Sequence, residues 1–412
     1  MADPRTIVER ELGRVDVPPF TLDTFHARRE RKRRNQRLAA GAVGVSIALA
    51  IAVIASQVAI QRDRTGGAQP VRNGSIAFIT NRGISLSDPD GTDPHVAVRK
   101  TDPVSDCLGG ERACDFRGLA WSPDGTKLAF VFGEPSVVFL GNTSVYVMDA
   151  ASEEVRLLAR CPAATGDPAG TCDDRNPLSW SPDGERIAIS SWDSLFIVDV
   201  ATGDLTQITG CGSCSYQGPA QEPTWSPDGD RIAFTGNETL LSVASDGSAT
   251  KTLVRSADAG ISINGARPRW SPDGSRLAFV ADEGMYVVNA NGSGLRLLVN
   301  HNPDIAFPSP TWSPDGRQLA YLMTTGLRDR AEIRVVDVTG GNDRVLYRSG
   351  CCIDDWRSPV FSPDGTKITF SLMVVDANHD LIGTYVFVME ADGSDVRRVP
   401  GFDQPAWQAL PR

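Results

Sequence analysis

Short apolar runs recur along the chain from residue 73 onward, and each is bounded by glycine, proline, aspartate or asparagine. The runs are rich in β-branched and aromatic residues and alternate with polar positions at a period of two, which predicts β-strands. Six of them hold the same place in a repeat, at residues 128–130, 187–189, 232–234, 277–279, 319–321 and 368–370. The pattern predicts an all-β protein.

A pentapeptide precedes each of these six runs. Its sequence is Trp-Ser-Pro-Asp-Gly at residues 121–125, 180–184, 225–229, 270–274 and 312–316, and Phe replaces Trp at residues 361–365. Proline presets the backbone for a type I turn, aspartate tolerates the next position, and glycine adopts the left-handed conformation that closes the loop. Each copy therefore predicts two strands joined by a tight turn, with the aromatic residue packed between sheets rather than forming an aromatic cage.

The repeat predicts a seven-bladed β-propeller over residues 73–408. This range divides into seven units of about 48 residues, enough for four short strands each. The last unit ends at Trp407, without a following turn motif, and can complete the first unit. Pairing the two ends closes the ring and removes both sheet edges. A six-bladed ring is the structural alternative, and an open solenoid is disfavoured because nothing caps its ends.

The N-terminal region differs in composition from the repeat. Residues 1–37 carry a net charge of +4, whereas the remainder carries −14. Residues 38–60 contain no charged side chain and are long enough to span a bilayer as a helix. The preceding basic run predicts a cytoplasmic N-terminus and a propeller outside the cell membrane. A cleaved signal peptide is the alternative, and residues 61–72 are expected to form a linker.

The repeat resembles that of the TolB-type β-propeller family, whose repeats are WD-like. The resemblance is carried by the segment at residues 285–294, Met-Tyr-Val-Val-Asn-Ala-Asn-Gly-Ser-Gly, and by Leu295-Arg296 after it. It covers residues 73–407. TolB proteins carry an α/β domain before the propeller, where this chain has the expected anchor; the related prolyl-oligopeptidase architecture adds a hydrolase domain that is also missing here. The resemblance implies a propeller that binds protein, peptide or glycan.

Eight cysteines follow the predicted anchor and fall into four local pairs, each before the next aromatic strand. They are Cys107 and Cys114, Cys161 and Cys172, Cys211 and Cys214, and Cys351 and Cys352. An even number of cysteines outside the membrane favours disulfides. We expect the first three pairs to be bonded, whereas Cys351 and Cys352 form a vicinal bond or pair elsewhere. The spacing of Cys211 and Cys214 also fits a redox or zinc site, which the surroundings do not favour.

The candidate binding residues lie in the segments between units, which a propeller places on one face. Three such segments carry acidic and arginine side chains shortly before the aromatic residue: Asp115, Arg117, Asp173, Asp174, Arg175, Asp354, Asp355 and Arg357. We expect them near the mouth of the central channel, on the face opposite the turn motifs. The alternative is that they form structural ion pairs between blades.

Few residues point to catalysis or to a cofactor. There is no nucleophile-elbow, zinc-protease or phosphate-loop motif, and the four histidines are scattered. Asp376 begins a segment like the start of a calcium loop, but its later ligands are missing. The predicted function is a non-enzymatic, membrane-anchored scaffold for an extracytoplasmic protein, peptide or cell-wall component, without a cofactor, metal or nucleic acid. The alternatives are an anti-sigma-like transmembrane sensor or regulator that engages a cytoplasmic regulator, such as a sigma factor, through residues 1–37, and a propeller hydrolase or lyase.

Overall fold

The structure is a computed structural model that describes residues 72–99, 115–133, 143–161, 178–191, 194–210, 221–236, 238–263, 267–281, 284–300, 310–325, 330–349, 359–375, 381–401 and 403–410. The chain divides into two compact units, Met1–Gln69 and Pro70–Arg412, and all described residues belong to the second unit. The predicted cytoplasmic segment, the membrane helix at residues 38–60 and the linker up to residue 71 lie outside the described residues. Within the described ranges, no helix has the length and apolar character needed to cross a membrane.

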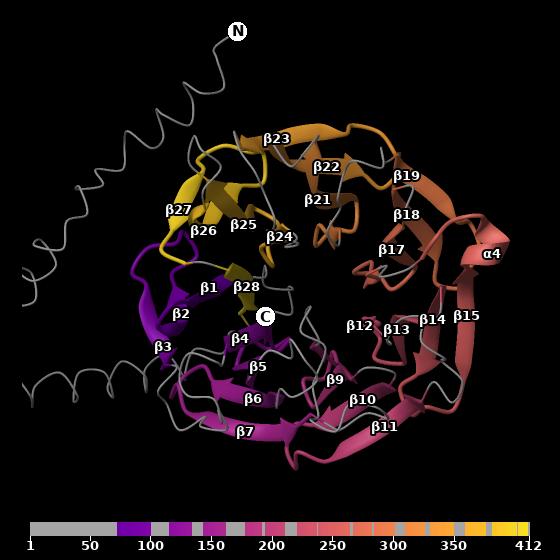
Figure 1. Ribbon diagram of the computed structural model, residues 1–412, viewed down its shortest axis with the longest axis horizontal. Coiled ribbons are helices and arrows are strands. Elements are labelled where there is room, and N and C mark those ends of the chain that lie inside the picture. The colour runs from indigo at the N-terminus through magenta and orange to yellow at the C-terminus, as the bar shows by residue number, and fades with distance from the viewer. Residues whose placement is uncertain are drawn as a thin grey trace, which may run out of the picture. The chain divides into compact units, whose positions relative to one another are not determined.

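The described residues form seven four-stranded antiparallel sheets arranged around a ring (Figure 1). The seven-bladed prediction is confirmed, and the six-bladed alternative is wrong. From the innermost strand outward, blade 1 contains β28 (Asp403–Ala409), β1 (Asn73–Thr80), β2 (Gly83–Ser87) and β3 (His95–Arg99). Blade 2 contains β4 (Asp115–Trp121), β5 (Lys127–Gly133), β6 (Thr143–Asp149) and β7 (Val155–Arg160). Blade 3 contains β8 (Ser179–Trp180), β9 (Arg186–Ser191), β10 (Ser194–Asp199) and β11 (Leu205–Gly210).

The other four blades repeat this order. Blade 4 contains β12 (Gln221–Trp225), β13 (Arg231–Gly236), β14 (Thr239–Ala244) and β15 (Thr250–Arg255), followed by the short helix α4 (Ser256–Ala259). Blade 5 contains β16 (Arg269–Trp270), β17 (Arg276–Ala281), β18 (Gly284–Asn289) and β19 (Arg296–Asn300). Blade 6 contains β20 (Thr311–Trp312), β21 (Gln318–Thr325), β22 (Arg330–Asp337) and β23 (Arg344–Ser349). Blade 7 contains β24 (Val360–Phe361), β25 (Lys367–Val375), β26 (Leu381–Glu390) and β27 (Arg397–Val399).

The antiparallel pairing divides the propeller into two faces. We call the face that carries the Ser-Pro-Asp-Gly turns the turn face. The turns between the third and fourth strands of each blade lie on it as well, because consecutive strands run in opposite directions. We call the opposite face the inter-blade face, since the fourth strand of one blade leads there to the first strand of the next. The predicted placement of the turns and inter-blade segments on opposite faces follows from this topology.

The turn motif has the predicted geometry, and its serine adds a second set of bonds. In the fourth copy, at residues 270–274 of blade 5, the Gly274 N–H donates to the Ser271 carbonyl at 2.9 Å, and Gly274 has a φ of 69°. The Ser271 hydroxyl donates to Asp273 Oδ1 at 2.5 Å and accepts the Arg276 N–H at 3.0 Å. The serine therefore fixes both the aspartate and the first residue of the next strand.

The aromatic residues tie neighbouring blades together. The indole N–H of Trp121, Trp180, Trp270, Trp312 and Trp407 donates to a backbone carbonyl of the preceding blade, at 2.9 to 3.2 Å. The acceptor is always the residue immediately before that blade's own aromatic residue. Trp225 departs from this pattern: its indole nitrogen is buried without a hydrogen-bond partner in the part of the chain that the structure describes. Phe361 has no such donor, so two of the seven junctions lack the bond.

Blade 1 closes the ring by pairing segments from the two ends of the repeat. Strand β28 pairs with β1, with Ile76 opposite Trp407 and Asn73 opposite Ala409. No turn motif follows β28, and Gln408 bridges the gap by accepting the Ser75 N–H at 2.8 Å and donating to the Gly125 carbonyl at 2.7 Å. This closure between the first and last segments is the arrangement predicted from the repeat.

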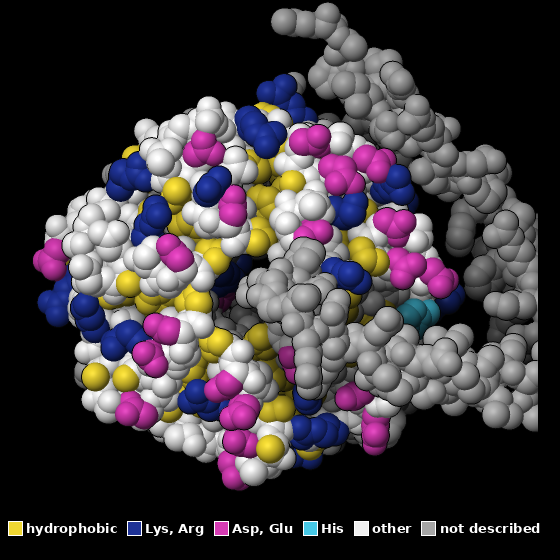
Figure 2. Space-filling view, turned by 180° about the vertical axis from the view of Figure 1, so that it is seen from behind, with side chains coloured by type: hydrophobic (Ala, Val, Ile, Leu, Met, Phe, Trp, Pro, Cys, Tyr) yellow, Lys and Arg dark blue, Asp and Glu magenta, His cyan; other side chains and the backbone are white. Residues whose placement is uncertain are grey.

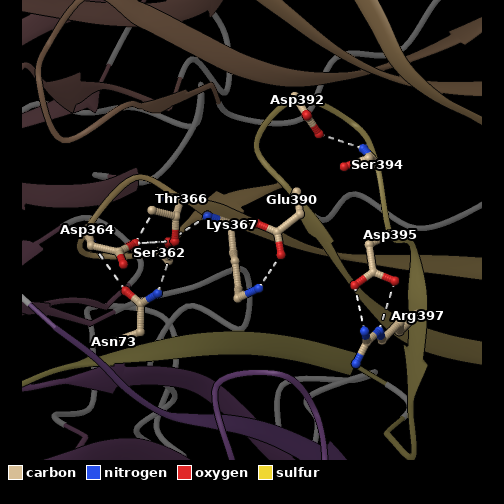
Figure 3. Close-up of polar contacts among 10 residues, drawn as sticks. All are labelled: Asn73, Ser362, Asp364, Thr366, Lys367, Glu390, Asp392, Ser394, Asp395 and Arg397. Atoms are coloured by element: carbon tan, nitrogen blue, oxygen red, sulfur yellow. Dashed lines mark hydrogen bonds and ion pairs between the residues drawn. The ribbon is translucent and has the colours of Figure 1, made fainter.

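The chain enters the propeller on the turn face. Figure 3 shows Asn73 against the turn motif of blade 7, where its Oδ1 accepts the Asp364 N–H at 3.2 Å and its Nδ2 donates to Thr366 Oγ1 at 3.5 Å. Lys367 and Glu390 form an ion pair in the same region. Because Asn73 begins β1, the N-terminal end of the propeller lies on the turn face.

Candidate functional site

The innermost strands surround an opening at the centre of the ring, visible in Figure 2. Along these strands the aromatic residue is buried, whereas the residue just before it is half-buried in all seven blades. These seven residues hold equivalent positions on the innermost strands. Six of them are uncharged: Ala406, Ala120, Ser179, Thr224, Thr311 and Val360. In blade 5 the position is occupied by Arg269, so the seven equivalent positions differ in charge.

Two of the predicted site residues belong to the described part of the chain. Asp115 and Arg117 lie in β4, not in a loop as expected from the sequence, because β4 begins at Asp115 and the two residues pair with Gly133 and Val131 of β5. Asp115 is exposed and Arg117 is half-buried, and both have interaction partners in the structure. The other predicted site residues lie outside the described residues: Asp173, Asp174, Arg175, Asp354, Asp355 and Arg357.

The clearest charged cluster of the inner strands joins blades 4 and 5, where the sequence analysis expected none. Glu222 of β12 is only 2% exposed. Its Oε2 accepts a hydrogen bond of 3.0 Å from Arg269 Nη2, and its Oε1 lies 2.9 Å from Arg267 Nε. We call these three residues the inner arginine cluster. Its members precede Trp225 or Trp270 in sequence, Glu222 and Arg269 within β12 and β16 and Arg267 just before β16, so they lie on the inter-blade side of these tryptophans.

In this cluster both arginines form ion pairs with the same carboxylate, that of Glu222. The Arg267 contact is an ion pair without hydrogen-bond alignment, because Glu222 Oε1 is buried without a hydrogen-bond partner among the described residues. Glu222 also adopts a φ of 47°, a left-handed conformation that is uncommon for a residue with a side chain. A buried carboxylate requires such pairing. Two guanidinium groups therefore contact one buried carboxylate, and Arg267 has a further interaction in the structure.

Register within the repeat is the signal that could have revealed this cluster. Both segments have the form charged-Pro-X-Trp, with Glu222 and Arg267 three residues before Trp225 and Trp270. Equivalent positions of neighbouring blades lie next to each other, so opposite charges there predict an ion pair. The cysteine-containing segments instead favoured candidate residues in blades 2, 3 and 7.

A second polar network lies away from the opening, on the outer strands of blade 6. Asp343 accepts hydrogen bonds from the Tyr321 hydroxyl at 2.7 Å and from the Arg334 guanidinium at 3.0 and 3.1 Å. Arg334 also bonds Glu332, which in turn accepts from Arg348. Burial, together with the negative charge of Asp343, raises the pKa of Tyr321 well above its usual range. The tyrosine therefore stays neutral and serves as a buried hydrogen-bond donor.

The cysteine and metal predictions fall mostly outside the described residues. Cys161 is the only one of the eight cysteines within them; it is buried and disulfide-bonded, and its partner lies outside them. The proposed pairing of all eight cysteines therefore stays a prediction. No group of three or more metal-ligating side chains occurs within the ranges that the structure describes. The segment that begins at Asp376 also lies outside them.

Comparisons with known proteins identify the fold. No protein-family model matches the chain, and no curated protein matches it. Among solved structures, TolB from Acinetobacter baumannii is 18% identical, with 84% of this chain and 81% of that chain covered and a TM-score of 0.49. An oligogalacturonate lyase in complex with manganese is 15% identical, with coverages of 82% and 86% and a TM-score of 0.54. A protein of unknown function from Desulfotomaculum acetoxidans is 13% identical, with coverages of 82% and 99% and a TM-score of 0.54. At these identities the likeness concerns the fold: the chain is similar to β-propellers with different activities.

Proposed function

We propose that this protein is a non-enzymatic scaffold, anchored in the cell membrane through residues 38–60, whose propeller binds a protein, peptide or cell-envelope ligand outside the membrane. The proposal rests on the observation that the propeller begins on one face, whereas charged residues of the inner strands lie toward the opposite face. The chain enters on the turn face at Asn73, whereas Asp115, Arg117 and the inner arginine cluster lie on the inter-blade side of the tryptophans. The inter-blade face is then the one presented away from the membrane.

The rigidity of the blade framework supports a binding role for this face. Indole bonds and the Gln408 bridge fix the inner strands, so side chains carried on them are held in place before a ligand arrives. A preorganised surface loses less conformational entropy on binding. We further propose that Cys107–Cys114, Cys161–Cys172 and Cys211–Cys214 disulfides brace the segments of this face.

Site-specific photo-crosslinking in cells that produce the full-length protein tests the proposal. A photoreactive amino acid at Asp115, which is exposed on the inter-blade side, should capture a partner outside the membrane. The same amino acid at Arg317, whose side chain is 84% exposed on the turn face, serves as the matched control. Products of equal yield at both positions, or no product at Asp115, would refute binding at the inter-blade face.

The same experiment separates the proposal from its alternatives. A photoreactive residue within residues 1–37 that captures a cytoplasmic regulator, while Asp115 captures nothing, would make the protein a transmembrane sensor. Stoichiometric divalent metal in the purified full-length protein would instead favour a hydrolase or lyase. Capture of an envelope protein or wall fragment from Asp115 alone supports the scaffold.

A further inference from the structure

Four turns of the turn face share one sequence pattern: aspartate or asparagine, then glycine, then serine or threonine. They join the third strand to the fourth in blades 1, 4, 5 and 7, at residues 90–92, 246–248, 291–293 and 392–394. Three of these turns begin with aspartate, whereas the turn of blade 5 begins with the exposed Asn291. A side chain in place of Gly292 would be strained, because its φ is 85° and an added Cβ would lie 2.7 Å from the Leu253 carbonyl oxygen.

The turn places two hydrogen-bond donors on the side-chain carbonyl of Asn291. Ser293 donates to Asn291 Oδ1 from its N–H at 2.9 Å and from its hydroxyl at 2.6 Å. The hydroxyl accepts a hydrogen bond of 3.1 Å from Asn289 Nδ2, and such chains of hydrogen bonds strengthen one another. Donors on a carbonyl oxygen stabilise the negative charge that develops there when a nucleophile attacks the carbonyl carbon.

The three equivalent aspartates indicate that this place in the turn favours a negatively charged oxygen. In each turn the hydroxyl of the residue two positions later, followed by its N–H, lowers the pKa of the aspartate; the pairs are Asp90 with Thr92, Asp246 with Ser248 and Asp392 with Ser394. Figure 3 shows the last of these turns, in which the Ser394 N–H donates to Asp392 Oδ1 at 2.8 Å. The blade 5 turn therefore surrounds an asparagine with the donors of an aspartate turn.

We propose that Asn291-Gly292 is a self-deamidation site, at which the backbone nitrogen of Gly292 attacks Cγ of Asn291 while Ser293 stabilises the oxyanion that forms on Oδ1. The new N–Cγ bond closes a succinimide ring, and the Gly292 nitrogen loses its proton to solvent. The Cγ–Nδ2 bond breaks, and the side-chain nitrogen takes up a proton and leaves as ammonia. Water then opens the ring, either at Cγ to give aspartate or at the main-chain carbonyl of residue 291 to give isoaspartate.

The structure also indicates how the reaction is limited and what its product does. The Gly292 N–H donates to the Asn289 carbonyl at 2.8 Å, so this bond must open before the nitrogen can attack. Alkaline solution favours loss of the proton from that nitrogen and should speed the reaction. The aspartate product suits the turn, since blades 1, 4 and 7 carry aspartate at the same position. The modification adds a negative charge to the turn face, and it does not depend on the proposed scaffold function.

Asn73-Gly74 is the matched control within the same chain. Asn73 pairs with Ala409 in the closure of blade 1, and its Oδ1 accepts the Asp364 N–H at 3.2 Å. A backbone held in a strand pair is less free to bring the glycine nitrogen to the side-chain carbon, so Asn73 should react more slowly than Asn291. Residues 264 and 265 form another Asn-Gly pair, which lies outside the described residues.

Peptide mapping of the purified full-length protein, incubated in heavy-oxygen water at neutral and at alkaline pH, tests the site. Asn291 should give aspartate and isoaspartate peptides that each carry a heavy oxygen from water, faster at alkaline pH and faster than Asn73. Ser293→Ala removes the hydroxyl donor and should slow conversion at Asn291 about fivefold, the effect of losing one hydrogen bond of ordinary strength. Ser293→Thr keeps the hydroxyl, as Thr92 does in blade 1, and should retain the wild-type rate.

Two further comparisons keep the outcome unambiguous. Asn291→Asp is the expected product, and its thermal melt should match that of the wild type because three other turns carry aspartate. If Ser293→Ala does not fold, the comparison of Asn291 with Asn73 in the wild type decides. Equal or faster conversion in a folded Ser293→Ala would mean that the turn protects Asn291, and it would overturn the site. Conversion at Asn291 that is absent, or no greater than at Asn73, would overturn it as well.

Discussion

The indole N–H of Trp270 donates a hydrogen bond of 3.1 Å to the Thr224 carbonyl of the preceding blade, and it does so from a buried ring. The same geometry recurs at four other junctions. It explains physically why tryptophan, and not merely an apolar side chain, stands before the turn motif. The ring fills the space between two sheets while its one polar atom donates a hydrogen bond to a backbone carbonyl of the neighbouring blade.

Replacing single tryptophans by phenylalanine should expose the difference between junctions. Trp270→Phe loses the bond to Thr224 and should lower the free energy of unfolding by about 1 kcal/mol or more. Trp225→Phe should cost less, because the Trp225 indole nitrogen is already buried without a partner in the described structure. Its remaining loss is a weaker contact with Arg186, whose guanidinium lies 4.7 Å from the ring. Urea titrations of both variants would show the order, and equal losses would contradict it.

The Gln408 bridge predicts a local weakness at the closure. Gln408→Ala removes the bonds to Ser75 and Gly125 and should lower the free energy of unfolding by about 1–2 kcal/mol. A chain ending at residue 402 lacks β28 altogether and should lose cooperative unfolding, because β1 then has an unpaired edge. A chain ending at residue 410 is the control. Calorimetry that finds the 402 chain as cooperative as the 410 chain would refute ring closure.

The turn aspartates predict acid sensitivity. The Ser271 hydroxyl and the Ser275 N–H lower the pKa of Asp273 to about 2, below the usual value for aspartate near 4. A lowered folded-state pKa gives stability that is present above pH 4 and is lost as the pH falls toward 2. Ser271→Ala should raise the pKa of Asp273 and reduce the fall in stability between pH 6 and pH 3. Carboxyl NMR titration and urea unfolding at both pH values measure this, and an unchanged pKa would contradict it.

The cysteine pairs predict a defined pattern in non-reducing peptide mapping. We expect linked peptides for Cys107 with Cys114, Cys161 with Cys172 and Cys211 with Cys214, because each pair is close in sequence and lies within one inter-blade segment. Cys161 is the residue whose bonded state the structure supports. Mass spectrometry that links Cys161 to a cysteine of another pair would show that the disulfides join blades instead.

Much of the fold follows from the repeat, because one turn motif sets the register of every blade. The strand that precedes each aromatic residue was harder to delimit. The sequence of Asp115 and Arg117 predicts a polar loop, yet both residues pair with β5, since β5 extends to Gly133. Charged residues therefore do not indicate where an innermost strand begins, because such a strand borders the central opening.

The candidate site was predictable only in part, for a different reason. Glu222 and Arg269 lie in different blades and are 47 residues apart in sequence. Hydrophobic periodicity does not report such contacts, because the charged positions interrupt the apolar pattern in both strands. Superimposing the units on their tryptophans would bring Glu222 and Arg267 to equivalent positions and reveal the opposite charges.

The closure of blade 1 has a consequence for how the protein is made. Ser75 and its partner Gln408 are 333 residues apart, so β1 leaves the ribosome early and its inner neighbour β28 leaves after every other strand. During translation six blades can form while the first keeps an open edge that invites pairing with other chains. A chain whose translation stops before β28 would therefore contain nearly all of the propeller, but the edge of its β1 would be unpaired and could pair with other chains.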